Sequence, residues 1–393
     1  MRLQRNLKLI GLFTVLTGLL FHLPILVLYY RDRIDLGYRE FLIGEAVWAA
    51  AIVLCDVPSG WISDTWKRKH TLASGLLISM MGYALLLAAR DFWQVVCIQA
   101  ILGIGYSFLS GTHTAMLYDS LLACGKESRY RKWESRRQAF SFYAIAAGCI
   151  AGGFLYSQNR FLPLLCVIAA QAAALGAVLL MDEPERHKRR GGKHPVADIL
   201  ATAKYALQGH AEVGFLIAGS ALLFCSTQLM LWSQQPYFIE LHVPESAFGL
   251  LVAGSFWMGG LASHLSPRLT RAYRTLPLLS FAFAAAAFIC FGAALSGGLP
   301  GIFLIMLGGS AVMGMVSPRV NDAINRRVGP SRRATILSTH SFMMSLLFVP
   351  ASVLLGLVAG HWDIRAALIV LAAWSGVAGL GLAGWNHKRR LRL

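Results

Sequence analysis

Long apolar runs separated by short polar segments dominate the pattern of the chain. A membrane-spanning helix needs about 20 mostly apolar residues, and twelve runs meet that requirement. Several contain glycine or proline, which membrane helices tolerate because neighbouring helices satisfy the freed backbone groups. We therefore expect an all-α membrane protein whose twelve spans are Leu7–Tyr30, Glu40–Ile62, Thr71–Ala89, Phe92–Leu122, Gln138–Tyr156, Leu162–Met181, Val213–Ile239, Ala247–Leu265, Leu276–Leu295, Gly301–Ala323, Thr335–Val358 and Ala366–Trp385.

The longest polar interruption divides the twelve runs into six and six. It covers residues 182–212 and contains a strongly basic stretch between Glu185 and His194. Such a segment is typical of a solvated cytoplasmic linker between two helical bundles, and a regulatory role for its basic residues is the alternative. We expect an N-terminal six-helix bundle (1–181), the linker (182–212) and a C-terminal six-helix bundle (213–393).

Short features recur about 200 residues apart, as an internal duplication would produce. The paired features are Gly60 with Gly260, Arg68 with Arg268, Asp119 with Asp322, and Arg136-Arg137 with Arg332-Arg333. Each pair alone is weak evidence. Together they favour two pseudo-symmetric six-helix bundles.

Composition excludes the common soluble classes. Hydrophobic residues make up 56% of the chain and charged residues only 14%, whereas soluble domains contain about 25% charged residues. The sequence shows no nucleotide-binding loop or catalytic triad, so we do not expect an enzyme. The seven cysteines form no CxxC pair and no metal-ligand spacing, so we expect no metal and no cofactor, and cysteines that pack as small apolar residues.

The distribution of cations predicts the orientation in the membrane. The chain has 36 Lys and Arg against 19 Asp and Glu. With the N-terminus in the cytoplasm, 30 of those 36 cations fall in the segments on the inner side, which is a strong positive-inside signal. We expect both termini in the cytoplasm, membrane lipids as partners, and no nucleic-acid partner.

The segment between the second and third spans resembles a known family motif. Gly60-x-x-x-Asp64-x-x-Lys67-Arg68-Lys69 is similar to the loop 2–3 motif of the major facilitator superfamily, G-x-x-x-D-x-x-G-R-K/R. Lys67 replaces the usual second glycine. The second copy, beginning at Gly260, is degraded and has His264 in place of the acid.

The resemblance implies two six-helix bundles that alternate access to the two sides of the membrane. It also implies that Asp64, Arg68 and Asp119 form a charged network that grips the opposite bundle. The alternative is that these charges only anchor helix ends at the membrane interface. We expect Gly60 to let the second span approach a neighbour closely.

The fifth span contains Gly148, Gly152 and Gly153, and this stretch resembles the end of a motif found in major facilitator antiporters. Cys149 stands at the position of the motif's proline. The plain interpretation is a face of small residues, Ala144, Gly148 and Gly152, for tight helix packing. The antiporter interpretation favours proton-driven export, and the sequence leaves both open.

Ionisable groups within spans are candidates for proton coupling because the bilayer makes them costly to keep. Glu45 in the second span is the first candidate, His113 in the fourth span is the second, and His22 in the first span lies at a depth similar to Glu45. The alternatives are that the histidines only fix helix packing and that Glu45 reaches water at the outer interface.

In the resembled fold, a substrate cavity lies between the bundles. The candidate lining residues are Tyr106, Ser110, Gln228, Trp232 and Met313, which suit an amphipathic compound, although they could equally fill helix interfaces. No Arg or Lys stands near the centre of a span, which argues against a dedicated phosphate or dicarboxylate carrier.

These features predict a monomeric transporter of the bacterial inner membrane. We expect it to export a small amphipathic compound, a drug-like molecule or a metabolite, driven by protons. The alternatives are proton-coupled uptake of a nutrient, a lipid flippase on the same fold, and a membrane receptor that transports nothing.

Overall fold

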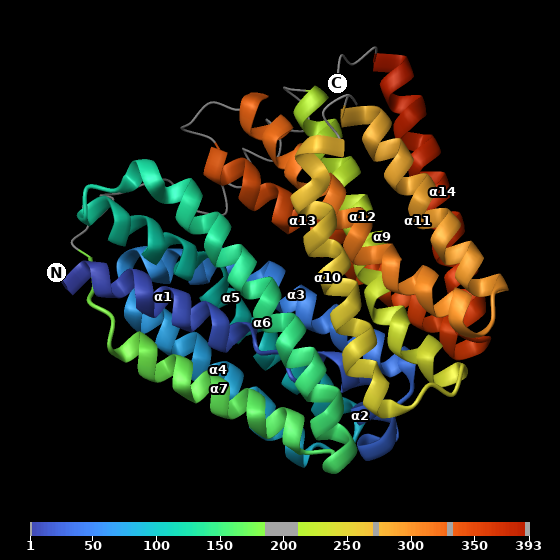
Figure 1. Cartoon of the computed structure of the whole chain (residues 1–393), viewed down its shortest axis with the longest axis horizontal. Helices are drawn as coiled ribbons and strands as arrows, with labels where there is room; N and C mark the ends of the chain where they lie inside the picture. The colour runs from blue at the N-terminus through green and yellow to red at the C-terminus, as the bar shows by residue number, and fades with distance from the viewer. Residues whose placement is uncertain (1, 185–210, 270–274, 328–332, 390–393) are drawn as a thin grey trace. The chain divides into compact units, whose positions relative to one another are not determined.

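The computed structural model describes residues 2–184, 211–269, 275–327 and 333–389. Within these ranges the chain is helical and contains no strand. Most of the expected linker lies outside the described residues. The helices, labelled in Figure 1, are α1 (Arg2–Gly18), η1 (Leu23–Ile25), α2 (Leu26–Tyr29), η2 (Tyr30–Ile34), α3 (Tyr38–Thr65), α4 (Arg68–Ala88), α5 (Phe92–Ala123), η3 (Glu127–Arg129), α6 (Tyr130–Gln158), α7 (Leu162–Leu179), α9 (Ala211–Glu240), α10 (Glu245–Leu269), α11 (Thr275–Leu295), α12 (Gly298–Arg327), α13 (Arg333–His361) and α14 (Ile364–Arg389).

The helices confirm an all-α membrane protein. Among the described residues, eleven helical stretches are long and apolar enough to cross a membrane. The remaining expected span, residues 40–62, corresponds to α3, which has 28 residues. Several helices continue past the apolar run, as α6 does by starting at Tyr130, because polar residues in water extend a helix as readily as apolar ones.

The first span is not one continuous helix, contrary to the prediction. α1 ends at Gly18, and the chain continues through η1, α2 and the π-helical turn η2 to Ile34. Pro24 lies in the first turn of η1, where its missing N–H cannot support a continuing α-helix. The apolar pattern could not reveal this break, because the residues on both sides are equally hydrophobic.

Two compact units are present, and each is built around its own apolar core. Unit 1 comprises residues 1–36, 47–192 and 244–253, and unit 2 comprises residues 37–46, 193–243 and 254–393. Two helices, α3 and α10, therefore begin in one unit and end in the other.

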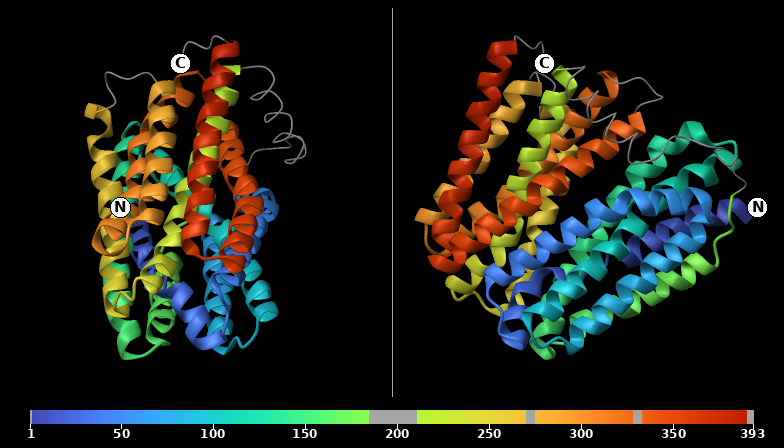
Figure 2. Two further views of the ribbon diagram at one scale, coloured as in Figure 1. Left: turned by 90° about the vertical axis from the view of Figure 1, so that its right-hand side faces the viewer. Right: turned by 180° about the vertical axis from the view of Figure 1, so that it is seen from behind.

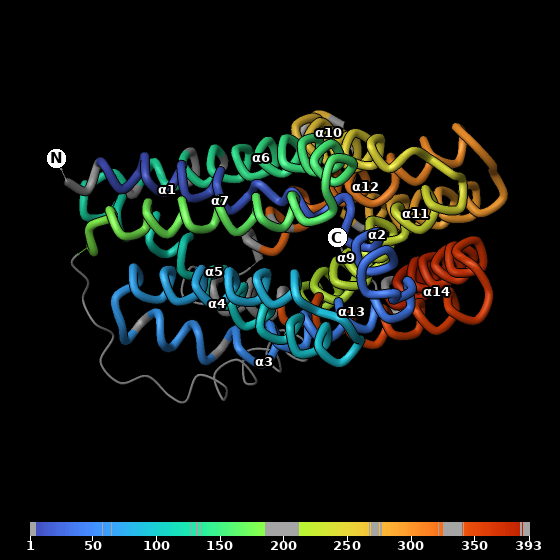
Figure 3. The backbone as a smooth tube through the Cα atoms, turned by 90° about the horizontal axis from the view of Figure 1, so that it is seen from below, coloured from blue at the N-terminus to red at the C-terminus, as the bar shows by residue number. Residues whose placement is uncertain are grey.

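In unit 1, α1 packs against α5, α6 and α7, and α4 packs against α5 and α7. Figure 3 shows α1, α6 and α7 running side by side. The core of unit 1 is built by α1, α4, α5 and α7 and includes Leu7, Phe13, Leu76, Leu117 and Val178, all 5% exposed or less.

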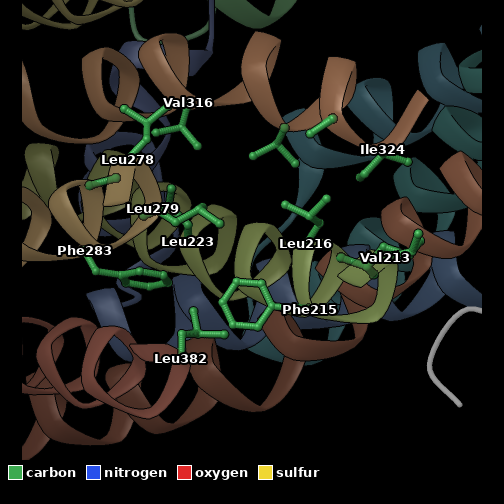
Figure 4. Close-up of a cluster of buried hydrophobic side chains, with 14 of the residues drawn as sticks. Val213, Phe215, Leu216, Leu223, Leu278, Leu279, Phe283, Val316, Ile324 and Leu382 are labelled. Atoms are coloured by element: carbon green, nitrogen blue, oxygen red, sulfur yellow. The ribbon is translucent and has the colours of Figure 1, made fainter. Parts of the chain in front are cut away.

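In unit 2, α9 is the central helix and contacts α11, α12, α13 and α14. In its most apolar stretch 78% of the residues are buried, against 50% or less in the other spans. α11 and α14 lie alongside each other in the view from behind (Figure 2). The core side chains of α9, α11, α12 and α14 meet as Figure 4 shows, with Phe215, Leu216, Leu279, Phe283 and Ile324 at most 1% exposed.

Glycines in unit 1 confirm the packing interpretation of the fifth span. A Cβ atom on Gly148 would lie 2.8 Å from the backbone nitrogen of Leu20, and one on Gly152 would collide with the carbonyl of Phe21. α6 therefore packs directly on the backbone of the segment that follows the end of α1, where the chain is no longer helical.

Candidate functional site

The motif residues lie at one end of unit 1, where α3 ends and α4 begins. α1 starts at this end, and α5 and α7 finish there, as the contacts described below show; Figure 1 shows the N-terminus and the last turn of α7 at the same end. The connection between α3 and α4 is only two residues long, Trp66 and Lys67. Both are exposed. The cations of the motif therefore lie at the start of α4.

Arg68 and Asp119 form the ion pair that the family resemblance implies. The guanidinium Nε of Arg68 lies 2.7 Å from Oδ2 of Asp119 on α5. The two side chains are only 12% and 15% exposed. A pair that is shielded from water interacts more strongly than a surface pair, and removing one partner leaves a costly unpaired charge.

The first turn of α4 is capped from a distant part of the chain. The N-cap residue Lys67 makes no side-chain cap of its own, and the first turn has no acidic residue. Glu183, which follows α7, accepts hydrogen bonds from the backbone N–H groups of Arg68 (2.8 Å) and Lys69 (3.0 Å). A carboxylate at this position satisfies two open donors and complements the helix dipole.

Lys69 caps α7 in return. Its ammonium donates to the carbonyl of Leu179 at 2.6 Å and to the carbonyl of Met181 at 3.1 Å. The last carbonyls of a helix lack partners within that helix. The start of α4 and the end of α7 thus cap each other.

Asn6 on α1 joins the same arrangement. Its amide donates to the carbonyl of Asp182 at 2.7 Å and to the hydroxyl of Ser120 at 3.2 Å, and its oxygen accepts from the N–H of Asp182 at 3.0 Å. The side chain is fully buried. We call Asn6, Lys69 and Glu183, together with the Arg68–Asp119 pair, the clamp.

Two other motif residues stand apart from the clamp. Gly60 is exposed, and a Cβ atom there would meet no described atom within 4 Å. The residue before it, Ser59, donates to the carbonyl of Ser107 on α5 at 3.0 Å, so α5 lies beside this part of α3, and the close approach expected at Gly60 itself stays a prediction. Asp64 ends α3, and its side chain lies outside the described residues.

Aromatic and charged groups flank the clamp on α6. Tyr130 contacts Tyr118 edge-on, with ring centroids 5.4 Å apart, and Arg137 pairs with Glu134 at 2.6 Å. Burial, assisted by the nearby Glu134 carboxylate, raises the pKa of Tyr130 to about 12. Tyr130 therefore stays protonated at physiological pH.

Glu45 lies in the part of α3 that belongs to unit 2 and is 5% exposed. Its helix is fixed to α9 by a hydrogen bond between the hydroxyls of Tyr38 and Ser233 (3.1 Å) and by an edge-on contact of Phe41 with Trp232 (5.0 Å). The burial argues against the alternative that Glu45 reaches water. Its role in proton coupling stays a prediction.

The two candidate histidines lie in unit 1. Nε2 of His22 is 3.1 Å from the hydroxyl of Tyr83, and its Nδ1 has no partner among the described atoms. Nδ1 of His113 lies 2.7 Å from the carbonyl of Leu109, one turn earlier on its own helix. These contacts are compatible with a packing role, and proton coupling by either histidine stays a prediction.

The five candidate substrate residues come from both units. In unit 1, Tyr106 is 47% exposed and packs on Trp48 with centroids 5.2 Å apart, and Ser110 is partly exposed. In unit 2, Trp232 is 6% exposed, and Gln228 and Met313 are partly exposed. Among the described residues, no group of three or more metal-ligating side chains occurs.

Sequence reasoning missed Asn6, Lys69 and Glu183 as parts of the site. A weak signal existed for two of them. Asn6 is a polar residue at the start of an apolar run, and Glu183 directly follows another. The partners of each lie more than 100 residues away in the sequence, and no spacing rule reaches that far.

Comparisons with known proteins agree on one family. The family model described as Major Facilitator Superfamily matches residues 9–349. The chain is 26% identical to an uncharacterized MFS-type transporter of Burkholderia mallei (strain SAVP1), covering 97% of this chain and 92% of that protein. It is 21% identical to the uncharacterized MFS-type transporter YxaM of Bacillus subtilis (strain 168), covering 92% and 91%.

Solved structures with similar folds are also transporters. A point mutant of the nucleoside transporter NupG superimposes with a TM-score of 0.81 at 14% identity, covering 97% of this chain and 99% of that one. The POT family transporter PepTSo superimposes with a TM-score of 0.74 at 11% identity, covering 99% of both. At these identities the likeness shows the fold alone.

Proposed function

Because the chain belongs to the Major Facilitator Superfamily, we propose that it works by alternating access and exports a small amphipathic compound, a drug-like molecule or a metabolite, in exchange for protons. The family and the relatives are transporters, so the chain is a multi-pass membrane transporter and not an enzyme. Direction, coupling ion and substrate class are the parts that we propose.

The Arg68–Asp119 ion pair is the observation that carries the proposed mechanism. The pair joins the two positions at which the family motif has its arginine and its helix-4 acid, and both side chains are largely shielded from water. Alternating access requires an arrangement whose states differ by a few kcal/mol, and a shielded pair at the motif supplies energy on that scale. In our proposal Asp64 completes this gate, and Asp64→Asn slows transport without preventing membrane insertion.

An amphipathic substrate is supported by the chemistry of the five candidate residues. Tyr106 and Trp232 offer aromatic surface, Met313 offers an adaptable apolar contact, and Ser110 and Gln228 offer hydrogen bonds. In this proposal Glu45 carries the coupling proton, with His113 and His22 as further candidates. Burial of Glu45 supports this role because a carboxylate shielded from water within a membrane span is costly to keep and is often functional.

We propose the bacterial inner membrane as the location, with both termini in the cytoplasm and the monomer as the working unit. The excess of cations on one side of the spans supports this orientation. A phosphatase fused after Leu393 tests it. The fusion should be inactive in intact cells if the C-terminus lies in the cytoplasm. An active fusion would show that the C-terminus lies on the opposite side of the membrane.

The first experiment identifies a ligand. The purified protein is screened for thermal stabilisation by chemically diverse compounds at several pH values, since a specific ligand stabilises the state that binds it. The compounds that stabilise are then loaded into proteoliposomes with an imposed proton gradient. Movement against the proton flow supports export, and movement with it establishes uptake instead.

Two control measurements complete this test. Labelled lipid that crosses between leaflets would identify a flippase, and an absence of flux for every stabilising compound would contradict transport. Glu45→Gln should abolish the dependence of flux on the proton gradient while leaving substrate binding intact. Proton coupling that survives this substitution would remove Glu45 from the proposal.

A further inference from the structure

We propose that Glu183 is the positioning residue of the gate, because it fixes the first turn of α4 at the place from which Arg68 reaches Asp119. The inference rests on the proposed gating role of the Arg68–Asp119 pair and assigns a new role to a residue outside the family motif. It also gives a role to Asn6 and Lys69, whose hydrogen bonds hold the segment just before Glu183.

The first step of the argument is that Arg68 is held at both of its ends. Its backbone N–H donates to Oε1 of Glu183 at 2.8 Å, and its side-chain Nε meets Asp119 at 2.7 Å. Hydrogen bonds between N–H and oxygen have donor–acceptor distances of about 2.7–3.2 Å and weaken steeply when the angle at the hydrogen falls below about 120°. A shift of the first turn of α4 by a fraction of a turn would therefore break the ion pair, and the bonds to Glu183 oppose that shift.

The second step is that Glu183 is itself immobilised. The residue before it, Asp182, has both its backbone N–H and its carbonyl bonded to the buried side chain of Asn6. The carbonyl of Met181 accepts from Lys69. The bonds to Asn6 tie the residue before Glu183 to α1, whereas the bond from Lys69 ties Met181 to α4 itself, so Asn6 is the anchor that holds Glu183 in place when α4 shifts.

The third step concerns charge. Lys67, Arg68 and Lys69 bring three cations to a helix start that has no acid of its own. The positive end of the helix dipole adds to their mutual repulsion. The carboxylate of Glu183 offsets this positive charge through the backbone N–H groups of the first turn. The guanidinium of Arg68 therefore remains available to pair with Asp119.

Replacement by glutamine separates the positioning role from simple removal of a side chain. Glutamine has nearly the same shape, but only one of its two terminal atoms accepts hydrogen bonds. Glu183→Gln therefore leaves one backbone N–H of α4 without its partner and removes the charge. Asp182→Asn is the matched control, because Asp182 takes part through its backbone.

The experiment follows the accessibility of Cys124, which ends α5 five residues after Asp119 and is partly exposed. The full-length protein in liposomes is reacted with N-ethylmaleimide, and mass spectrometry measures the alkylation rate at Cys124. Hydrogen exchange measures the backbone amides of Arg68 and Lys69 in the same samples. The variants are Asp119→Asn, Glu183→Gln, both together, and Asp182→Asn.

We expect Asp119→Asn and Glu183→Gln each to accelerate alkylation of Cys124 by about tenfold, the scale set by loss of one charged hydrogen bond. The double variant should react no faster than Asp119→Asn alone, although exchange at Arg68 and Lys69 still rises. Non-additivity of this kind shows that Glu183 acts through the pair. A purely structural cap would add its full effect in both backgrounds. Asp182→Asn should behave as wild type.

Two other results would overturn the proposal in distinguishable ways. If Asp119→Asn leaves alkylation unchanged, the ion pair does not gate and the proposed mechanism fails with this inference. If Asp119→Asn accelerates alkylation but Glu183→Gln has no effect, or adds fully to it, the gate stands and the positioning role of Glu183 fails.

Discussion

Arg68 in unit 1 and Arg268 in unit 2 occupy matching places in the repeated pattern, 200 residues apart, but their surroundings differ. Arg68 is 12% exposed and paired with Asp119. Arg268 lies in the last turn of α10, is exposed, and has no ion-pair partner among the described residues. Near it, the hydroxyl of Ser266 donates to the carbonyl of Met315 at 2.6 Å, which joins α10 to α12 by a neutral bond.

This difference shows that the motif positions can recur in the second half of the sequence without the ion pair and the helix caps found in the first half. The positions equivalent to Asp64 and Lys69 hold His264 and Leu269 in unit 2. Leucine at 269 cannot donate hydrogen bonds as Lys69 does to the carbonyls at the end of α7, so the later copy lacks this cap. The charged end of unit 1 can respond to neighbouring charges, whereas the neutral bond in unit 2 can only hold helices together.

The largest expected effect comes from breaking the shielded pair. Arg68→Ala should lower the free energy of unfolding by roughly 2–3 kcal/mol, because Asp119 remains largely buried without its partner. Arg268→Ala should change it by less than about 0.5 kcal/mol, as is usual for an exposed side chain. Denaturation of the full chain in detergent micelles measures both. Equal losses would contradict the contrast between the two units.

Asn6→Ala should have the next largest effect, about 2 kcal/mol, because it leaves buried polar groups of Asp182 and Ser120 without their partner. Thr14→Val is a matched control on the same helix, since the hydroxyl of Thr14 bonds only within α1, to the carbonyl of Ile10. That variant should lose less than about 0.5 kcal/mol. The same unfolding assay decides, and a small loss for Asn6→Ala would show that α1 is not fastened through this residue.

Lys69→Leu gives unit 1 the residue found at the matching position of unit 2. The expected loss is about 1 kcal/mol, because the last carbonyls of α7 lose their cap. Lys67→Leu removes a neighbouring, exposed cation and should be nearly neutral. If the two variants lose the same stability, the effect belongs to net charge and not to capping.

The smallest effect comes from restoring the acid in unit 2. His264→Asp places a carboxylate one turn before Arg268 on α10, and such a pair should stabilise the helix by about 0.3–0.5 kcal/mol. His264→Asn should give no gain. The gain should also disappear in high salt, because salt screens exposed charges. A gain that persists in high salt would point to another cause.

Much of the fold followed from one physical rule, that long apolar runs become helices when water is absent. That rule predicted where the spans lie, because in the absence of water the backbone N–H and C=O groups of a segment such as α9 must pair with one another, as they do in a helix. It could not find the end of α1 at Gly18, because the break depends on Pro24 and on the close approach of Gly148 and Gly152. Pro24 is visible in the sequence, but the contacts of Gly148 and Gly152 with Leu20 and Phe21 appear only in the structure.

The site was predicted only for the residues that the family resemblance supplied. Arg68 and Asp119 were expected as partners, and the structure brings them together. Asn6 and Glu183 were not expected, because their partners lie on helices far along the chain. Gly60 shows another limit, since its place in the motif predicts a close approach, and the described atoms leave that prediction open.

The division of α3 and α10 between the two units has a mechanical consequence. Long helices curve gently and bend sharply only at particular places, such as proline or glycine–serine pairs. The changeovers fall at Ala46–Val47 and at Ala253–Gly254, and each has a glycine within three residues, Gly44 and Gly254. Glycine destabilises a helix interior, so these are the points at which α3 and α10 bend most readily. Replacing either glycine with alanine should make that bending slower.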